Sequence, residues 1–184
     1  MLISKYGNGS VELVEEFENK YGIKFDEEYR IFLIKYNGGD TPLTSIKRGK
    51  HKEDVRYLYG INTNGNIEKE FKYFDWAKLQ CIPIGEDCFG NYFTIGITEE
   101  NKGVIYFCDH ERGFRKAKIA DSFKKFVEKC NSDIMDESFR RTPEETEKFV
   151  IANGYGDKIN DALRKVWKEE YEYYKDMVQE EVIL

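Results

Sequence analysis

The sequence predicts an α+β fold, in which two N-terminal helices and a later covering helix pack on a mainly antiparallel sheet of about five or six strands. Helical stripes of apolar residues fill the chain before residue 40, and short β-rich runs separated by turns fill its middle. A further helical stripe follows at 119–130, and an acidic, helix-rich segment ends the chain. Helices and strands therefore occupy separate stretches, as is typical of the α+β class.

The two N-terminal helices each carry a start and a stop signal. In "SVELVEEFENKYG" the apolar residues recur at helical spacing, Ser10 can cap the start and Gly22 can end the helix. In "DEEYRIFLIKYNGG" Asp26 is the expected cap, and Asn37 with Gly38 supplies a left-handed stop.

The middle of the chain is expected to form an antiparallel meander. Residues 41–52 are polar and basic, which favours a solvated loop over a phosphate-contacting one. The β-rich runs are "VRYLYGI", "CIPIG", "NYFTIGIT" and "GVIYFC", while "FKYFDW" is ambiguous because it is aromatic at almost every position. The glycines of "GEDCFGN" indicate a tight hairpin turn, and "IADSFKKFVEKC" has the apolar face of a covering helix.

The C-terminal segment differs from the rest in charge. Residues 131–184 carry 14 acidic and 8 basic side chains, whereas residues 1–130 carry 21 of each. Thr142-Pro143 is a strong helix start, and an apolar stripe runs from Ile159 to Val178. We expect a domain at 1–130 and a helical extension at 131–184 that packs on it, with self-association as the alternative.

The composition limits the class of protein. With 40% hydrophobic and 35% charged residues the chain is globular, and it shows neither a signal peptide nor a long apolar run, so we expect no membrane partner and a cytoplasmic location. The four cysteines form no CxxC pair and are expected to be small, reduced core residues. Because no basic footprint stands out, direct binding of nucleic acid is not expected.

The stretch "CDHE", residues 108–111, places four metal-binding or catalytic residue types side by side. If the preceding strand continued, Cys108 and His110 would face one side and Asp109 and Glu111 the other, so the four cannot converge on one ion. A metal-dependent enzyme built on Asp87 and residues 109–111 is one hypothesis. The residues favour a strand end without chemistry, and we predict no catalytic residue, no metal and no cofactor.

Several motifs in order resemble the SUKH superfamily, bacterial immunity proteins related to the yeast cell-wall-assembly regulator. Helical motifs Phe17-Glu18, Tyr29, Phe32-Leu33 and Asn37-Gly38-Gly39 stand at the matching places, with Phe25-Asp26 in place of the usual Leu-Pro. The later motifs are "LYGI", "IPIGEDCFGNYFTIGI", "GVIYFCDHE" and "IADSFKKFV". The resemblance covers about 115 residues and ends near residue 130.

The resemblance implies a non-enzymatic immunity protein that binds a cognate protein toxin, often a nuclease, and neutralises it by occluding the active site. A regulatory adaptor for signalling or cell-wall-synthesis partners is the alternative, and a monomer or weak homodimer is expected in either case. Loops held by a rigid sheet commonly carry recognition. The expected toxin-binding residues are Asn37, Gly38, Gly39, Asp87, Phe89, Asn91, Asp109, His110 and Glu111.

Overall fold

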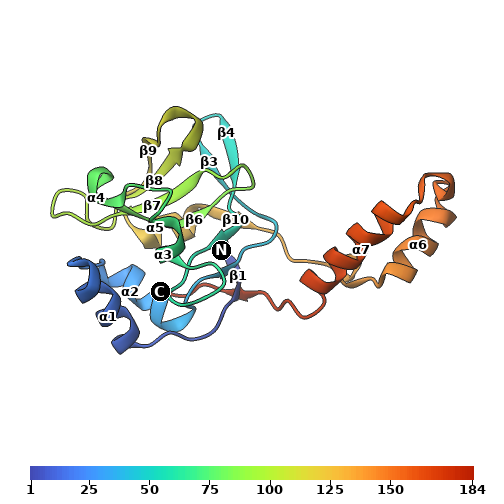
Figure 1. Ribbon diagram of the computed structural model, residues 1–184, viewed down its shortest axis with the longest axis horizontal. Coiled ribbons are helices and arrows are strands. Elements are labelled where there is room, and N and C mark those ends of the chain that lie inside the picture. The colour runs from blue at the N-terminus through green and yellow to red at the C-terminus, as the bar shows by residue number, and fades with distance from the viewer. The chain divides into compact units, whose positions relative to one another are not determined.

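The computed structural model describes all 184 residues, which form two compact units. Unit 1 comprises Met1–Asp133 together with Glu180–Leu184, and unit 2 comprises Ile134–Gln179. Both ends of the chain therefore lie in unit 1 (Figure 1). The class is α+β, as the sequence predicts. None of the helices combines the length and the apolar character needed to cross a bilayer.

Unit 1 contains an eight-stranded and a three-stranded sheet, and every strand pairing in both is antiparallel. The larger sheet has the order β11-β1-β2-β5-β6-β7-β8-β9 and the smaller one β10-β3-β4. The strand count exceeds the predicted five or six because several strands are only two to four residues long. The strands are β1 (Leu2–Lys5), β2 (Gly39–Asp40), β3 (Thr44–Arg48), β4 (His51–Asp54), β5 (Tyr57–Leu58), β6 (Cys81–Glu86), β7 (Tyr92–Gly96), β8 (Ile105–Asp109), β9 (Arg115–Ala120), β10 (Cys130–Ser132) and β11 (Glu180–Glu181).

The helices begin where the capping signals place them. Ser10 caps α1, Asp26 caps α2, and Gly22 ends α1 in a left-handed conformation, φ 63°. The ambiguous stretch "FKYFDW", residues 71–76, forms mainly a turn between two single-turn helices, and only its last residue, Trp76, belongs to one of them. The helices are α1 (Val11–Tyr21), α2 (Glu27–Lys35), α3 (Ile67–Glu70), α4 (Trp76–Leu79), α5 (Phe123–Lys129), α6 (Pro143–Ala152) and α7 (Asp161–Tyr174).

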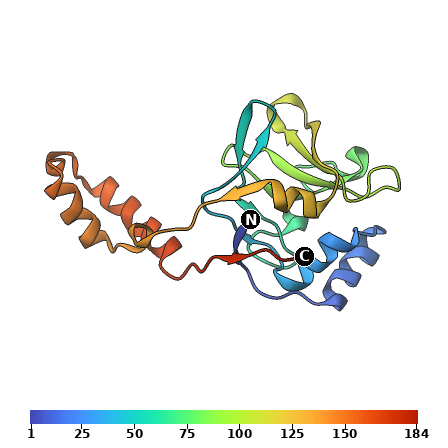
Figure 2. The same ribbon diagram turned by 180° about the vertical axis from the view of Figure 1, so that it is seen from behind.

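Aromatic side chains hold the helices on the large sheet. Phe123 of α5 packs between Tyr29 and Phe32 of α2, at ring-centroid distances of 5.0 and 4.9 Å. Phe126, on the same face of α5, lies 5.5 Å from Phe93 of β7. The predicted covering helix thus joins α2 to the sheet, and Figure 2 shows α5 leading directly into β10.

Residues 41–52 do not form the solvated loop that their charge predicts. They contain most of the β3–β4 hairpin, which turns at Gly49 with φ 62° and pairs with β10. Ile46 is buried and supplies the apolar contact, while lysines cover the outer positions. Lysine-rich exposed strands are common because charge discourages edge-to-edge association, so charge alone does not exclude a strand.

The chain leaves unit 1 after β10 and returns to it through β11, which pairs with β1. Leu2 lies beside both connections: its N–H donates to Ser132 Oγ at 2.9 Å, and its backbone pairs with Glu181. Beyond β11, Tyr36 Oη donates to the Glu181 carbonyl and accepts from the Ile183 N–H, at 3.2 and 2.9 Å. Unit 2 is therefore an insertion between two strands of unit 1.

Unit 2 contains a helical hairpin built from α6 and α7. The Thr142 hydroxyl and the Glu145 side chain form the predicted capping box at the start of α6. Arg164 of α7 reaches back to Glu147 of α6 with two hydrogen bonds, at 2.9 and 3.1 Å. The terminal helix is shorter than predicted, since Asn160 caps its start and it ends at Tyr174.

Three of the four cysteines occupy the core and one does not. Cys81, Cys108 and Cys130 are buried, in agreement with their predicted role. Cys88 is exposed, which corrects the prediction at that position. Its N–H donates to Asp54 Oδ2 at 2.9 Å, which ties the β6–β7 connection to the β3–β4 hairpin.

Candidate partner-binding surface

The loop between β6 and β7, residues 87–91, is organised by one buried carboxylate. Asp87 Oδ1 accepts the N–H groups of Phe89 and Asn91 at 2.9 and 2.8 Å, and Oδ2 accepts the Asn91 side-chain amide at 2.8 Å. Gly90 provides the left-handed residue that the reversal needs, with φ 82°. These bonds fix a loop that leaves Phe89 73% exposed at its tip.

A second turn lies beside this loop because β7 and β8 are paired. Asp109 accepts the Glu111 N–H at 3.0 Å and starts a single 3-10 turn, His110–Arg112, which ends at Gly113. Asn91 Oδ1 accepts the His110 N–H at 3.1 Å and lies 3.0 Å from His110 Nδ1. The loop and the turn are thus joined into one surface.

The same turn determines how the residues of "CDHE", 108–111, are arranged. β8 ends at Asp109, so His110 is no longer on a strand and does not share a face with Cys108. Cys108 is buried in the core while His110 and Glu111 are exposed. Nowhere in the chain do three or more His, Cys, Asp or Glu side chains gather in a group able to hold a metal ion.

The third predicted segment, residues 37–39, lies in the interior. Asn37 is buried, and its amide exchanges two hydrogen bonds with the backbone of Ile61, at 2.8 and 3.0 Å. A Cβ on Gly38 would lie only 2.6 Å from the backbone of Gly60, so only glycine fits there. Because buried residues cannot meet a partner, Asn37, Gly38 and Gly39 do not form part of an exposed binding surface.

The exposed residues Phe89, His110 and Glu111, together with the half-buried Asn91, define the loop surface. Asp87 and Asp109 lie beneath it and hold the two backbone turns. Arg112 adds an ion pair to Asp109 at 3.4 Å. Such a surface presents one large aromatic side chain together with polar and acidic groups on a preorganised backbone, which suits protein recognition.

A tyrosine and glutamate cluster next to the loop surface was missed in the sequence. Glu86 directly precedes Asp87, and its carboxylate accepts the hydroxyls of Tyr57 and Tyr59, the latter at 2.7 Å. Tyr92 donates to Glu70 at 2.8 Å. Burial, followed by these hydrogen bonds, raises the pKa of all three tyrosines, so the hydroxyls remain donors.

The signal for this cluster is the strand register. Tyr57 pairs with Glu86 and Glu86 with Tyr92, which places the three side chains in one row across β5, β6 and β7. The register cannot be read from separate strand patterns, which explains why the cluster was missed. Tyrosine hydroxyls donate hydrogen bonds to both carboxylates of the cluster, Glu86 and Glu70. These bonds stabilise the strands from which the loop surface projects.

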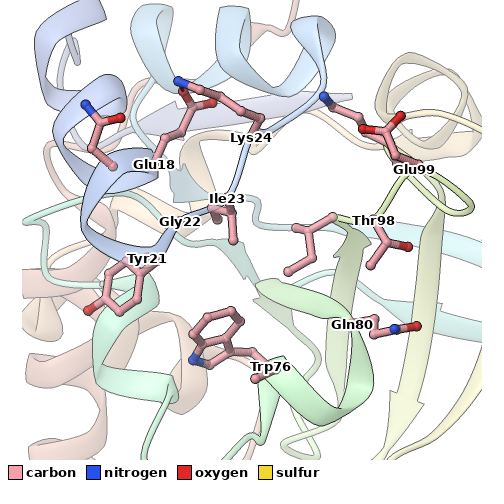
Figure 3. A pocket seen from close by; sticks show the side chains of 13 residues that line it. Glu18, Tyr21, Gly22, Ile23, Lys24, Trp76, Gln80, Thr98 and Glu99 are labelled. Carbon is pink, nitrogen blue, oxygen red and sulfur yellow. Dashed lines mark hydrogen bonds and ion pairs between the residues drawn. The ribbon is translucent and has the colours of Figure 1, made fainter.

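A groove of about 650 Å³ lies between the end of α1 and the turn after β7. Figure 3 shows Tyr21 and Trp76 on one side of it and Thr98 and Glu99 on the other. The buried Glu18 carboxylate at its margin accepts Lys24 at 2.8 Å and the Phe25 N–H at 3.0 Å. This carboxylate is therefore already satisfied by donors of the chain itself.

Sheet, helices and rigid loops together define an α+β domain whose exposed features are suited to binding. The model of the SMI1 / KNR4 family (SUKH-1) matches residues 9–129. The chain belongs to this family, in agreement with the resemblance read from its motifs. No curated protein matches the chain significantly. The strands β1, β10 and β11 and the whole of unit 2 lie outside the matched residues.

Proposed function

We propose that the protein is an immunity protein, which binds a cognate protein toxin and neutralises it without catalysing a reaction. Membership of the SMI1 / KNR4 family (SUKH-1) supports this class of function. The favoured target is a nuclease toxin, and the mechanism is occlusion of its active site by the loop surface. The protein acts as a monomer or weak homodimer.

The observation that carries the proposal is the exposed Phe89 on a loop fixed by Asp87. A large aromatic side chain on a preorganised backbone loses little conformational entropy on binding, and such residues are frequent energetic hot spots. Glu111 is exposed beside it. An acidic group at the rim steers a basic nuclease toward the surface and makes association depend on salt.

The test is protection of cells that co-express the protein with the toxin encoded by the neighbouring gene. The double variant Phe89→Ala with Glu111→Ala is expected to weaken binding by at least tenfold and to lose protection, since a hot spot contributes about 2 kcal/mol or more. Its thermal unfolding midpoint should stay within about 2 °C of the parent, because both side chains are exposed.

Val11→Ala with Glu100→Ala is the matched control, since it also removes one exposed apolar and one exposed acidic side chain. It should bind like the parent. Equal binding by both double variants would reject the loop surface. A large stability loss in the first would show that Phe89 and Glu111 serve the fold.

The alternative is a regulatory adaptor that uses the same surface to hold intracellular signalling or cell-wall-synthesis partners. Both proposals require protein binding. Only an immunity protein, however, restores growth in the presence of the toxin. Failure of protection despite a stable fold would favour the adaptor.

A further inference from the structure

Three lysines form a row across the smaller sheet, outside the loop surface. Lys47 of β3 and Lys52 of β4 are direct cross-strand partners, so their side chains leave the same face about 5 Å apart. On the other side of β3, Asn131 pairs with Ser45. Extending that register by two residues along each strand places Lys129, the last residue of α5, beside Lys47.

The lysine row has no carboxylate counterpart. Like charges directly opposite each other destabilise a sheet, and an acidic neighbour would normally relieve them. The nearby acids are engaged elsewhere: Glu53 binds Arg48 at 2.9 Å, and Asp54 accepts the Cys88 N–H at 2.9 Å. The row is thus an uncompensated concentration of positive charge in a protein that is acidic as a whole.

The row surrounds a hollow of about 620 Å³, lined by the three lysines with Ser45 and Asn131. Lys129 Nζ donates to the Ile119 carbonyl at 2.7 Å, which holds its ammonium group in place with further donors free. All five lining side chains can donate a hydrogen bond. None is aromatic, so bases have nothing to stack on.

We propose that this hollow binds a phosphate group that is either the free ion or a terminal monoester. Such a group carries a charge of about −1.5 to −2 at neutral pH and several strong acceptor oxygens, which match the three lysines that line the hollow. A nucleic-acid backbone would instead need cations spread along a track with stacking platforms. The phosphate can belong to free inorganic phosphate or to the terminal phosphate of a nucleotide.

The first experiment follows thermal unfolding of the full chain in sodium phosphate and in sodium chloride at equal ionic strength. Phosphate at ten times its dissociation constant should raise the unfolding midpoint by about 4 °C. Lys52→Gln should abolish this rise. Without phosphate the same variant should unfold no lower than the parent, because it removes a like-charge pair.

Lys50→Gln is the matched control, since Lys50 is exposed at the hairpin turn and does not line the hollow. It should keep the full phosphate response. An equal response in Lys50→Gln and Lys52→Gln, or none in the parent, would overturn the proposal.

The second experiment separates the possible sources of the phosphate. It compares binding of inorganic phosphate with that of two short single-stranded oligonucleotides that differ only in a 5′ phosphate. A preference of tenfold or more for the phosphorylated oligonucleotide identifies a terminal phosphate as the ligand, and binding of inorganic phosphate alone identifies the free ion. Equal binding of the two oligonucleotides would show backbone contacts and reject a site for a free or terminal phosphate.

Discussion

Glu18 is a charged side chain that is fully buried in unit 1. Burial alone would raise its pKa, but hydrogen bonds from Arg30, Lys24 and the Phe25 N–H outweigh that effect and hold the pKa below its ordinary value. The carboxylate links the end of α1 to the start of α2 through these three partners.

Replacing Glu18 by glutamine should therefore lower the free energy of unfolding by about 2 kcal/mol at pH 7, since Arg30 and Lys24 lose the charge of their buried partner. A carboxylate with a depressed folded pKa stabilises the fold above the unfolded pKa of about 4.3, and the contribution disappears as the pH falls through the folded pKa. The difference in urea unfolding between parent and variant should thus shrink as the pH falls below about 4.3.

Glu16→Gln on the same helix is the control, because Glu16 is exposed. It should change the unfolding free energy by less than about 0.5 kcal/mol at either pH. A gap between Glu18→Gln and the parent that stays constant down to pH 2 would mean that charge at Glu18 is not the cause.

At the scale of the elements, β11 is one of three two-residue strands, and it forms one edge of the large sheet. It contains two residues, but the chain after it is fixed by Val182, which is buried, and by both hydrogen bonds of the Tyr36 hydroxyl. Tyr29 lies in α2, whose C-cap is Tyr36, yet the buried hydroxyl of Tyr29 has no hydrogen-bond partner.

Tyr36→Phe and Tyr29→Phe therefore make a matched pair. Losing two hydrogen bonds should cost Tyr36→Phe about 1 to 2 kcal/mol in unfolding free energy, with faster amide exchange at Ile183. Removing the unpaired hydroxyl of Tyr29 should be neutral or slightly stabilising. The comparison is made by urea unfolding and hydrogen exchange, and equal losses in the two variants would contradict the role given to β11.

Local signals predicted the helices well and the short strands poorly. Caps such as Ser10, Asp26 and Thr142 act within one turn, so the sequence alone reveals them. β1 and β11 are held by partners far away in the chain, and the β3–β4 hairpin is too basic to look like a strand. Long-range pairing, not propensity, decides these elements.

The distinction between local signals and long-range contacts also applies to the loop surface. Glycine and aspartate signals located the turns at 87–91 and 109–111, because these residues shape the backbone locally. Whether a turn faces solvent depends on what packs against it, so the burial of residues 37–39 under Gly60 and Ile61 could not be read from the motif. The tyrosine and glutamate cluster needed the strand register.

At the scale of the whole molecule, the net charge is divided between the two units more evenly than the predicted boundary at residue 130 implies. Unit 2 carries 11 acidic and 8 basic side chains, and unit 1 carries 24 and 21. Asp133, Glu180 and Glu181 belong to unit 1, so each unit has a net charge of −3. Docking of the helical segment on the domain, and its role as an acidic attraction for a basic toxin, remain predictions.

The connections on either side of Leu2 allow unit 2 to be removed without disturbing β11. A chain in which a linker of about four glycine and serine residues replaces residues 134–179 should fold as unit 1 does, because both attachment strands keep their partners. Replacing the 46 residues by a short linker lowers the entropic cost of closing the connection between β10 and β11. This should favour folding by about 2 kcal/mol. Circular dichroism and urea unfolding provide the measurement.

Truncation after Asp133 is the comparison, since it removes β11 along with unit 2 and should unfold at lower urea. If the linker variant were as unstable as the truncated one, unit 2 would be required for the core. If it folds, its rate of toxin binding at low and high salt shows directly whether the helical unit contributes to association.

The exposure of Cys88 provides a way to follow the binding of a partner. It is the one cysteine at the surface, and it directly precedes Phe89. A single fluorophore coupled to its thiol would therefore report from inside the loop surface, in the unaltered sequence. Limited burial, followed by the neighbouring Asp54, raises the pKa of the thiol, so coupling needs mildly alkaline buffer. Quenching or a spectral shift of that dye would make arrival of a partner visible in real time.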